Sequence, residues 1–314
     1  MKRSVLVLIL VFLLLPCMTV FAAGKFRIAV SLPPANNAWQ AKMLDSVIAE
    51  IAKDKDKFDI IVKNAVDDAD QLDMLQTFKE GGYDMICVLP GNGTLMTPIC
   101  AEIYRSGTKI MIIDRPVEGD EYTVFYGGDN YQCGANAAKY LGDRLKGKGQ
   151  IAILRSYIGI PIDLQRYNGF MDVLKKDYPG IKVLVEGDGE FNQEAGRKAM
   201  SNILPAYPKI DAIYTQDDEG AVGALSEIRS AKRKDIKFIT GFGGSKSAFE
   251  RMNKKSPNYD PMYGASMSYL PTMGGRAVAL AKKILLGAKF EKWIVEPTVV
   301  VTSENVHKYV DEAY

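Results

Sequence analysis

Histidine is almost missing from this sequence, since His307 is the only one among 314 residues. A histidine-based catalytic triad and a metal site with several histidine ligands are therefore excluded. The glycine-rich run at 241–246 completes neither of the two phosphate-binding templates, so it is interpreted as a turn after a strand expected at 237–240. Asp217 and Asp218 are adjacent and cannot face each other as a catalytic carboxylate pair does. We expect no enzymatic activity, no cofactor and no metal.

Cysteine is also scarce, with four in the whole chain. Cys17 lies in the N-terminal segment, which leaves Cys87, Cys100 and Cys133 at scattered spacing. Three cysteines without a Cys-x-x-Cys pair make neither a disulfide framework nor a zinc site. Cys87 falls in an apolar stretch and is expected to be a buried hydrophobic residue, although a Cys87–Cys100 disulfide would be compatible with an oxidising compartment.

No strong charge of either sign is present, because the formal net charge is only +2. This balance gives no broad electrostatic reason for binding nucleic acid or an anionic membrane surface. The composition, with 47% hydrophobic and 25% charged residues, is typical of a globular protein. A length of 314 residues fits one large domain or two medium ones.

The first 23 residues differ from all that follow. Lys2 and Arg3 precede an aliphatic run at 5–15, and small residues follow up to Ala23. This order is typical of a secretory signal peptide, and the run is shorter than the ~20 residues that span a bilayer. We expect cleavage near Ala23 and export to the periplasm or the outer face of the cell envelope. Two alternatives are lipidation at Cys17 and a retained membrane anchor.

After residue 24, short apolar runs alternate with longer amphipathic stretches. Apolar residues at 39, 43, 47 and 51 repeat every four positions, which is the period of one helix face. The expected strands of this first series lie at 26–31, 58–63, 84–89, 109–113 and 123–126. Alternating strands and helices predict a parallel sheet covered by helices on both faces.

The same alternation of strands and helices then begins again. Strands are expected at 150–154, 181–185, 212–215 and 237–240, with helices near 164–178, 193–206 and 221–231. Gly127 and Gly128 separate the two series and suit a crossing point between them. A helix near 272–286 and a strand near 297–302 could complete either half. The predicted fold class is α/β, with two doubly wound parallel-sheet lobes.

Polar residues follow the predicted strands at once. Asn37 comes shortly after the first strand, Asp114 and Arg115 follow the fourth, and Asp217 follows the strand at 212–215. Ligands of open parallel sheets bind beyond the carboxyl ends of the strands. If the two lobes face each other, these residues share one cleft.

Each of these residues also has a structural interpretation. Trp39 could stack on the apolar face of a sugar ring or pack in the core. The Asp114–Arg115 pair offers acceptors and donors for hydroxyl groups, but could equally be a solvated ion pair. Arg166 could be a surface arginine, and Asp217 could serve only as a helix cap.

Taken in order, the motifs of this chain resemble those of periplasmic sugar-binding proteins of the ribose- and galactose-binding type. The likeness covers essentially the whole sequence after the predicted signal peptide. It is carried by the segments 28–31 and 36–37, the Asp114–Arg115 pair, and the runs 128–130, 166–170 and 216–224. It implies two lobes joined by a three-crossover hinge, the type I fold, that close over a monosaccharide or a sugar-like polyol. It also implies a monomer that delivers its ligand to an ATP-driven (ABC) importer.

The resemblance assigns individual residues to the ligand site. It implies that Asn37 is a polar ligand contact, that Trp39 stacks on the ligand, and that Phe191 is an aromatic contact from the second lobe. Asp217 stands where Asn is usual in ribose-binding members. Three residues match positions that bind hydroxyl groups, namely Asp114, Arg115 and Arg166.

Three site positions depart from the family pattern. Gln40 replaces a second stacking aromatic residue, Gly243 replaces a ligand-binding Asp, and Tyr269 replaces a frequent Gln. These changes remove one acceptor carboxylate and one aromatic wall, so ribose, glucose and galactose should not be assumed as ligands.

The expected N-terminal lobe comprises 24–128 plus about 270–294, and the C-terminal lobe 129–269 plus about 295–314. The leading hypothesis is a solute-binding protein. The alternatives are a receptor component that docks on a signalling membrane protein, such as a chemoreceptor, and an exported carbohydrate-modifying enzyme.

Overall fold

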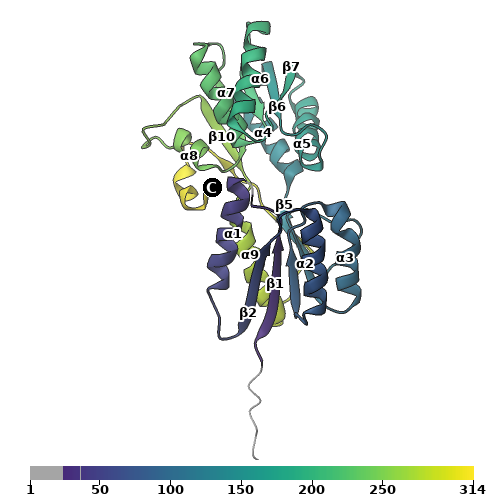
Figure 1. Cartoon of the computed structure of the whole chain (residues 1–314). Helices are drawn as coiled ribbons and strands as arrows, with labels where there is room; N and C mark the ends of the chain where they lie inside the picture. The colour runs from purple at the N-terminus through teal and green to yellow at the C-terminus, as the bar shows by residue number, and fades with distance from the viewer. Residues whose placement is uncertain (1–23, 36) are drawn as a thin grey trace, which may run out of the picture.

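Strands and helices alternate along the chain and form two α/β lobes, one above the other in Figure 1. The computed structural model describes residues 24–35 and 37–314. The predicted signal peptide at 1–23, with Cys17, lies outside the described residues. No helix in the part of the chain that is described combines the length and the apolar character needed to span a bilayer.

The N-terminal lobe contains a wholly parallel sheet with the strand order β11-β5-β4-β3-β1-β2. Its strands are β1 (Phe26–Leu32), β2 (Phe58–Asn64), β3 (Met85–Val88), β4 (Lys109–Ile113), β5 (Val124–Gly128) and β11 (Trp293–Glu296). Helices α1 (Ala38–Ile51) and α9 (Met273–Leu285) share one hydrophobic core against it, and α2 (Asp68–Glu80) and α3 (Gly93–Arg105) share another. Alternate residues of β1 enter these two cores, as the two-residue period of a strand requires.

The C-terminal lobe has a similar sheet, parallel except for β12, with the strand order β12-β10-β9-β8-β6-β7. Its strands are β6 (Lys148–Arg155), β7 (Gly180–Asp188), β8 (Ala212–Thr215), β9 (Phe238–Gly243), β10 (Tyr263–Ser268) and β12 (Val300–Val301). Its helices are α4 (Asn130–Arg144), α5 (Pro161–Asp177), α6 (Gln193–Ala206), α7 (Asp218–Ser230) and α8 (Lys246–Met252). Two short 3-10 turns follow, η1 (Val306–Lys308) and η2 (Val310–Glu312).

The chain passes between the two sheets three times. It leaves the first sheet after β5, returns between β10 and α9, and crosses again between β11 and β12. The predicted α/β class, with two parallel-sheet lobes and a three-crossover hinge, is confirmed. One hydrophobic core runs through this hinge and contains residues from both sheets.

Some strands differ from the sequence-based expectation. The strands β10 and β11 had not been expected, and the strand near 297–302 is reduced to β12, which pairs antiparallel with β10. The predicted turn at Gly241 is wrong, because β9 continues to Gly243. Glycine and serine weaken the strand signal in β9 and β10, but both strands lie inside the sheet, where ladder hydrogen bonds hold them.

The three described cysteines are buried free thiols in separate elements. Cys87 lies in β3, Cys100 in α3 and Cys133 in α4. Burial raises the pKa of each thiol to about 12. They are packing residues, as expected for Cys87, and no Cys87–Cys100 disulfide is formed.

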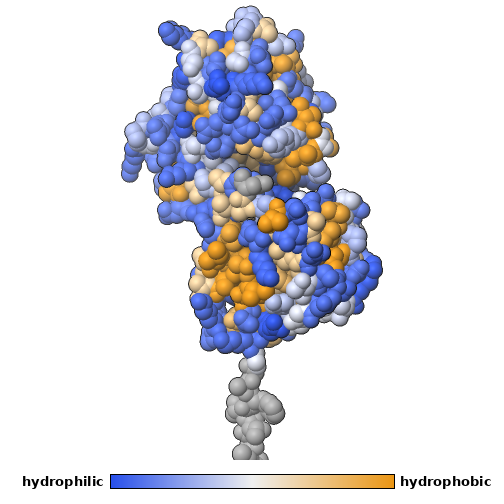
Figure 2. All heavy atoms as spheres, in the orientation of Figure 1, coloured by the Kyte–Doolittle hydropathy of each residue, from blue (hydrophilic) through white to orange (hydrophobic). Residues whose placement is uncertain are grey.

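Hydrophobic side chains also reach the surface of the N-terminal lobe. Figure 2 shows them gathered on the face where α1 and the edge strand β2 lie. Ile48 is 50% exposed there, and Leu44, Ile60 and Val62 are only partly buried.

Glycines allow the helices of the C-terminal lobe to cross at very close range. A Cβ atom at Gly134 of α4 would collide with the backbone carbonyl of Arg166 in α5, and one at Gly169 would collide with that of Tyr131. A similar crossing joins α6 and α7 at Gly223. The close contact between α4 and α5 fixes the position of Arg166 relative to the start of α4.

We expect Gly134→Ala to destabilise the protein by about 1–3 kcal/mol, because the added methyl group must push two backbones apart. Denaturant unfolding of the wild type and the variant measures this difference. Lys139→Ala, on the exposed side of the same helix, should leave stability nearly unchanged. A Gly134→Ala variant as stable as the wild type would contradict the close crossing.

Candidate functional site

Asp114, Trp39 and Tyr269 meet at the junction of the lobes. Tyr269 lies between β10 and α9, where the chain returns to the N-terminal lobe. Its hydroxyl donates a 2.5 Å hydrogen bond to Asp114 Oδ1. Trp39, in the first turn of α1, donates from Nε1 to the Tyr269 carbonyl oxygen at 2.8 Å. The two rings lie 6.2 Å apart. These contacts join the carboxyl end of β4 to the hinge.

Arg166 is a buried cation that contacts no carboxylate in the described structure. Its side chain donates from Nη1 to the Gln216 carbonyl oxygen at 2.7 Å and from Nε to Asn130 Oδ1 at 3.0 Å. The guanidinium carbon lies 3.4 Å from the centre of the Phe242 ring, which is cation–π stacking. Arg166 is only 6% exposed, and burial lowers the pKa of its guanidinium. A desolvated cation held this way retains donor capacity for a ligand.

Arg115 stays within the N-terminal lobe. Its Nη1 donates to the carbonyl oxygens of Pro90 and Gly91 at 3.3 and 3.0 Å. Its Nε is buried without a hydrogen-bond partner and lies 3.8 Å from Asp114 Oδ2. Buried donors are rarely left unpaired, so a ligand oxygen bridging Arg115 Nε and Asp114 Oδ2 would complete both groups.

Asp217 and its neighbour have different roles. The Asp217 carboxylate accepts from the Gly220 N–H at 2.7 Å, which caps α7. Burial raises the pKa of Asp217 to about 7, the negative charge of Asp218 adds to the rise, and Arg166 opposes it. Asp218 is fully buried and accepts hydrogen bonds from the backbone of Gly244, among others. It therefore holds the loop after β9 in place.

Two site residues have strained backbones. Asp114 has φ of +62° at the end of β4, and Phe191 has φ of +53° in the loop after β7. Such conformations are unfavourable for residues with a side chain and persist only where the surrounding structure imposes them. The Phe191 ring lies 5.8 Å from the Arg166 guanidinium carbon. Strain thus occurs where strand ends present side chains to the junction.

The remaining predicted residues lie at the border of the cluster that contains Trp39, Asp114, Arg166 and Tyr269. Asn37 is exposed, and its side chain accepts from the Gln40 backbone N–H at 2.9 Å, which caps α1. Gln40 is half-buried in the first turn of the same helix. Gly243 ends β9 with φ of +120°, next to Phe242.

Sequence reasoning missed three residues of the cluster. Asn130 starts α4, holds Arg166 and approaches the Tyr269 hydroxyl at 3.4 Å. Phe242 stacks on Arg166 and lies 5.4 Å from the Tyr269 ring. Gln216 binds Arg166 through its backbone, and its side chain accepts from Ser156. Asn130 and Gln216 lie in two of the runs that carry the family resemblance but were not assigned to the site, and Phe242 was given only as part of a turn.

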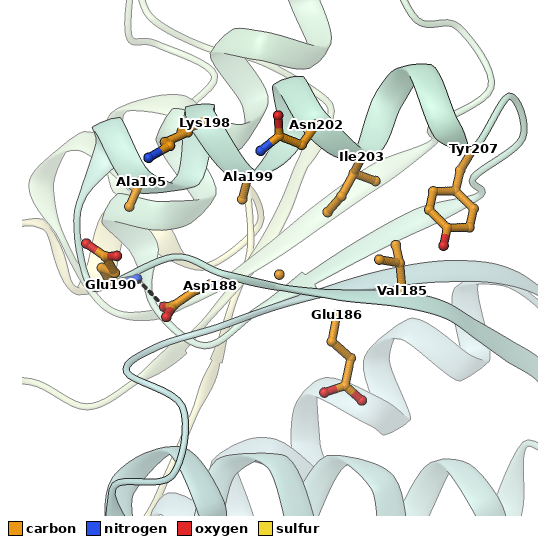
Figure 3. Close-up of a pocket in the computed structure, with 11 residues that line it drawn as sticks. Val185, Glu186, Asp188, Glu190, Ala195, Lys198, Ala199, Asn202, Ile203 and Tyr207 are labelled. Atoms are coloured by element: carbon orange, nitrogen blue, oxygen red, sulfur yellow. Dashed lines mark hydrogen bonds between the residues drawn. The ribbon is translucent and has the colours of Figure 1, made fainter.

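Two surface cavities are present among the described residues. One of about 420 Å³ lies between β7 and α6, and Val185, Lys198, Asn202 and Tyr207 are among the residues that line it (Figure 3). None of the predicted site residues lines it. The other, of about 350 Å³, lies at the hinge and reaches Tyr269 from the side of Glu296 and Tyr309.

The arrangement offers the chemical groups that neutral, hydroxyl-rich molecules require. Asp114 supplies acceptors from one lobe, and Arg166 supplies donors from the other. Phe191 and Phe242 supply aromatic surface beside Arg166, and Trp39 supplies it beside Tyr269. Polyhydroxyl compounds need this combination of donors, acceptors and flat apolar area.

Comparisons with known proteins identify the family of this chain. A family model described as a periplasmic binding protein domain matches residues 28–289. The ribose import binding protein of Bacillus subtilis is 26% identical over 281 residues, which cover 89% of this chain and 88% of that protein. The xylitol-binding protein of Mycolicibacterium smegmatis is 28% identical over 50% of this chain and 45% of its own length.

Solved structures show the same fold. A solute-binding protein of an ABC transporter from Bacillus halodurans, solved with myo-inositol, has a TM-score of 0.80 and 25% identity, with 92% of this chain and 98% of that chain covered. A fructose-binding periplasmic domain of a hybrid two-component system has a TM-score of 0.76 and 29% identity, with 91% and 93% covered. With its family match over 28–289 and its two lobes joined by three crossings, the chain belongs to the periplasmic binding protein family and has the type I fold.

Proposed function

We propose that this chain is an exported solute-binding protein that captures a monosaccharide or a sugar-like polyol between its lobes and delivers it to an ABC importer. The observation that carries the proposal is the buried Arg166, which has no contacting carboxylate and lies within 5.8 Å of three aromatic rings. One of these rings, Tyr269, donates a hydrogen bond to Asp114 and so links the two charged groups. The named ligands of the relatives, ribose, xylitol and myo-inositol, are all neutral polyhydroxyl compounds and support it. The protein acts by binding alone, without a catalytic step or cofactor.

The proposed mechanism is hinge closure. The lobes comprise 24–128 plus about 270–294, and 129–269 plus about 295–314, and the sheet that each strand joins supports this division. A ligand that contacts Asp114 on one lobe and Arg166 on the other binds the closed arrangement better than the open one and so shifts the population. Ligands that lack a hydroxyl leave a buried partner unpaired, at a cost of about 1–3 kcal/mol.

Three aspects of the working protein follow from the proposal. The protein is exported by a signal peptide at 1–23 to the periplasm or the outer face of the cell envelope. It works as a monomer and presents its closed form to the transporter permease. Its ligand site uses the residues Asn37, Trp39, Gln40, Asp114, Arg115, Arg166, Phe191, Asp217, Gly243 and Tyr269.

A receptor component for signalling is the second candidate. The likeness to a fructose-binding domain of a hybrid two-component system favours it. The genes beside this one distinguish the two candidates, since a permease and an ATPase support import and a membrane-bound signalling protein supports sensing.

A thermal-shift screen of residues 24–314 tests the proposal directly. The panel is D-ribose, D-allose, D-fructose, L-arabinose, xylitol and myo-inositol. At a hundredfold excess over its dissociation constant, a ligand should stabilise the protein by about 2.7 kcal/mol and raise its melting temperature by several degrees. A panel without any shift would contradict a sugar or polyol ligand of this kind.

Arg166→Lys should weaken binding of the best panel ligand by about ten- to hundredfold, since lysine keeps the charge but loses the planar set of donors. Titration calorimetry measures the affinity, and melting without ligand shows whether the fold is retained. The exposed Arg197→Lys should bind like the wild type. Equal affinity of both variants would remove Arg166 from the site.

Asp217→Asn should stabilise the ligand-free protein at pH 8 and have little effect near pH 4. The pKa of this carboxyl is raised from 3.8 to about 7 on folding. Its contribution to wild-type stability is therefore fully present below pH 3.8 and is lost as the pH rises toward 7. Asparagine caps helices as well as aspartate, so the cap remains. Melting temperatures of both proteins from pH 4 to 8 measure this, and a difference independent of pH would contradict the burial of the charge.

A further inference from the structure

Tyr314, the last residue of the sequence, lies against the end of β9. Its hydroxyl oxygen is 2.6 Å from the position that a Cβ atom at Gly243 would occupy. The backbone on either side of Ser245 holds it, since Lys246 N–H donates to the Tyr314 carbonyl oxygen at 2.7 Å and Tyr314 N–H donates to Gly244 at 3.4 Å. Figure 1 shows this end of the chain between α8 and α1.

The segment that carries Tyr314 is fixed to both lobes. Val306 is buried in the core of the C-terminal lobe. Glu312 accepts from Arg276 Nη1 of α9 at 2.9 Å and from Thr272 Oγ1 at 2.7 Å, and Lys42 Nζ of α1 reaches the Asp311 carbonyl oxygen at 3.4 Å. Segment 302–314 therefore bridges the two lobes beside the junction.

The side chain of Tyr314 lies close to the proposed ligand site. Gly243, next to it, follows directly on Phe242, the ring that stacks on Arg166. Burial raises the pKa of the Tyr314 hydroxyl well above its usual value, with Asp218 and Asp217 adding to the rise and Arg166 lowering it. Among the described residues this hydroxyl has no hydrogen-bond partner, so both its proton and its lone pairs are available.

Gly243 supplies no side chain at a strand end where neighbouring strands present polar groups. The space that such a side chain would fill is taken by the Tyr314 hydroxyl, because a Cβ atom at 243 would lie within 2.6 Å of it. A residue from the far end of the sequence thus completes this part of the junction.

We propose that Tyr314 forms a wall of the ligand site at Gly243 and selects among ligands there. The inference rests on the proposed function, since it concerns the same site. A phenol is neutral at physiological pH, with one donor, two lone pairs and an apolar ring. Such a wall favours a neutral ligand that presents a single hydroxyl or an apolar C–H edge to Gly243, and disfavours one with adjacent hydroxyls that need a carboxylate acceptor.

The test compares Tyr314→Phe and Tyr314→Ala with the wild type against the same six compounds. Calorimetry gives the affinity for each compound, and melting without ligand checks the fold. We expect Tyr314→Phe to lower the affinity for the ligand that the wild type binds best by up to about tenfold, as for one lost neutral hydrogen bond. We expect Tyr314→Ala to change the order of preference among the six. Tyr309→Phe, in the same segment, serves as the control and should keep both the wild-type affinity and the wild-type order of preference.

The outcomes separate this inference from the function on which it rests. A wild type that binds none of the six compounds contradicts the proposed function. If the wild type binds and both Tyr314 variants keep its affinities and its order of preference, the proposed role of Tyr314 is contradicted. Equal weakening of all six compounds with an unchanged order also overturns it, because that pattern shows an effect on closure and not on selection.

Discussion

The burial of one guanidinium governs the junction between the lobes. Arg166 is removed from water without a carboxylate in contact, so its charge is compensated by the Phe242 ring, the Gln216 carbonyl group and the Asn130 amide. Each of these groups comes from a different element, which forces the start of α4, the end of β8 and the end of β9 into one place. Desolvation of a charge is costly enough that these partners must be held accurately.

Glycines make this arrangement possible in the helices, and strain accompanies it in the loops. The contact of α4 with α5 at Gly134 and Gly169 brings the Arg166 backbone against the start of α4. The positive φ angles of Asp114 and Phe191 turn these side chains at the strand ends. The core that passes through the hinge supports these conformations from both lobes.

Much of the fold was predictable because it depends on local pattern. Apolar runs with a period of two or four residues gave most strands and helices, and the renewed alternation of strands and helices after Gly128 gave two lobes. β10 escaped prediction because glycine and serine weaken its strand signal, and β11 because it is short and pairs with β5, a strand that is distant in sequence. The positions of Asp114, Arg115 and Asp217 after strands were predictable for the same reason as the strands themselves.

The α/β class, the two parallel lobes and the strand-end placement of the polar residues can be read from the sequence alone. They follow from periodicity and from the fact that the carboxyl ends of parallel strands meet at one edge of a sheet. The partners of these residues, in contrast, become known only from the folded molecule. It pairs Tyr269 with Asp114, stacks Phe242 on Arg166 and places Tyr314 beside Gly243. These contacts join residues up to 155 positions apart, as for Tyr269 and Asp114, and no local preference encodes them, because they depend on how the lobes and crossings pack.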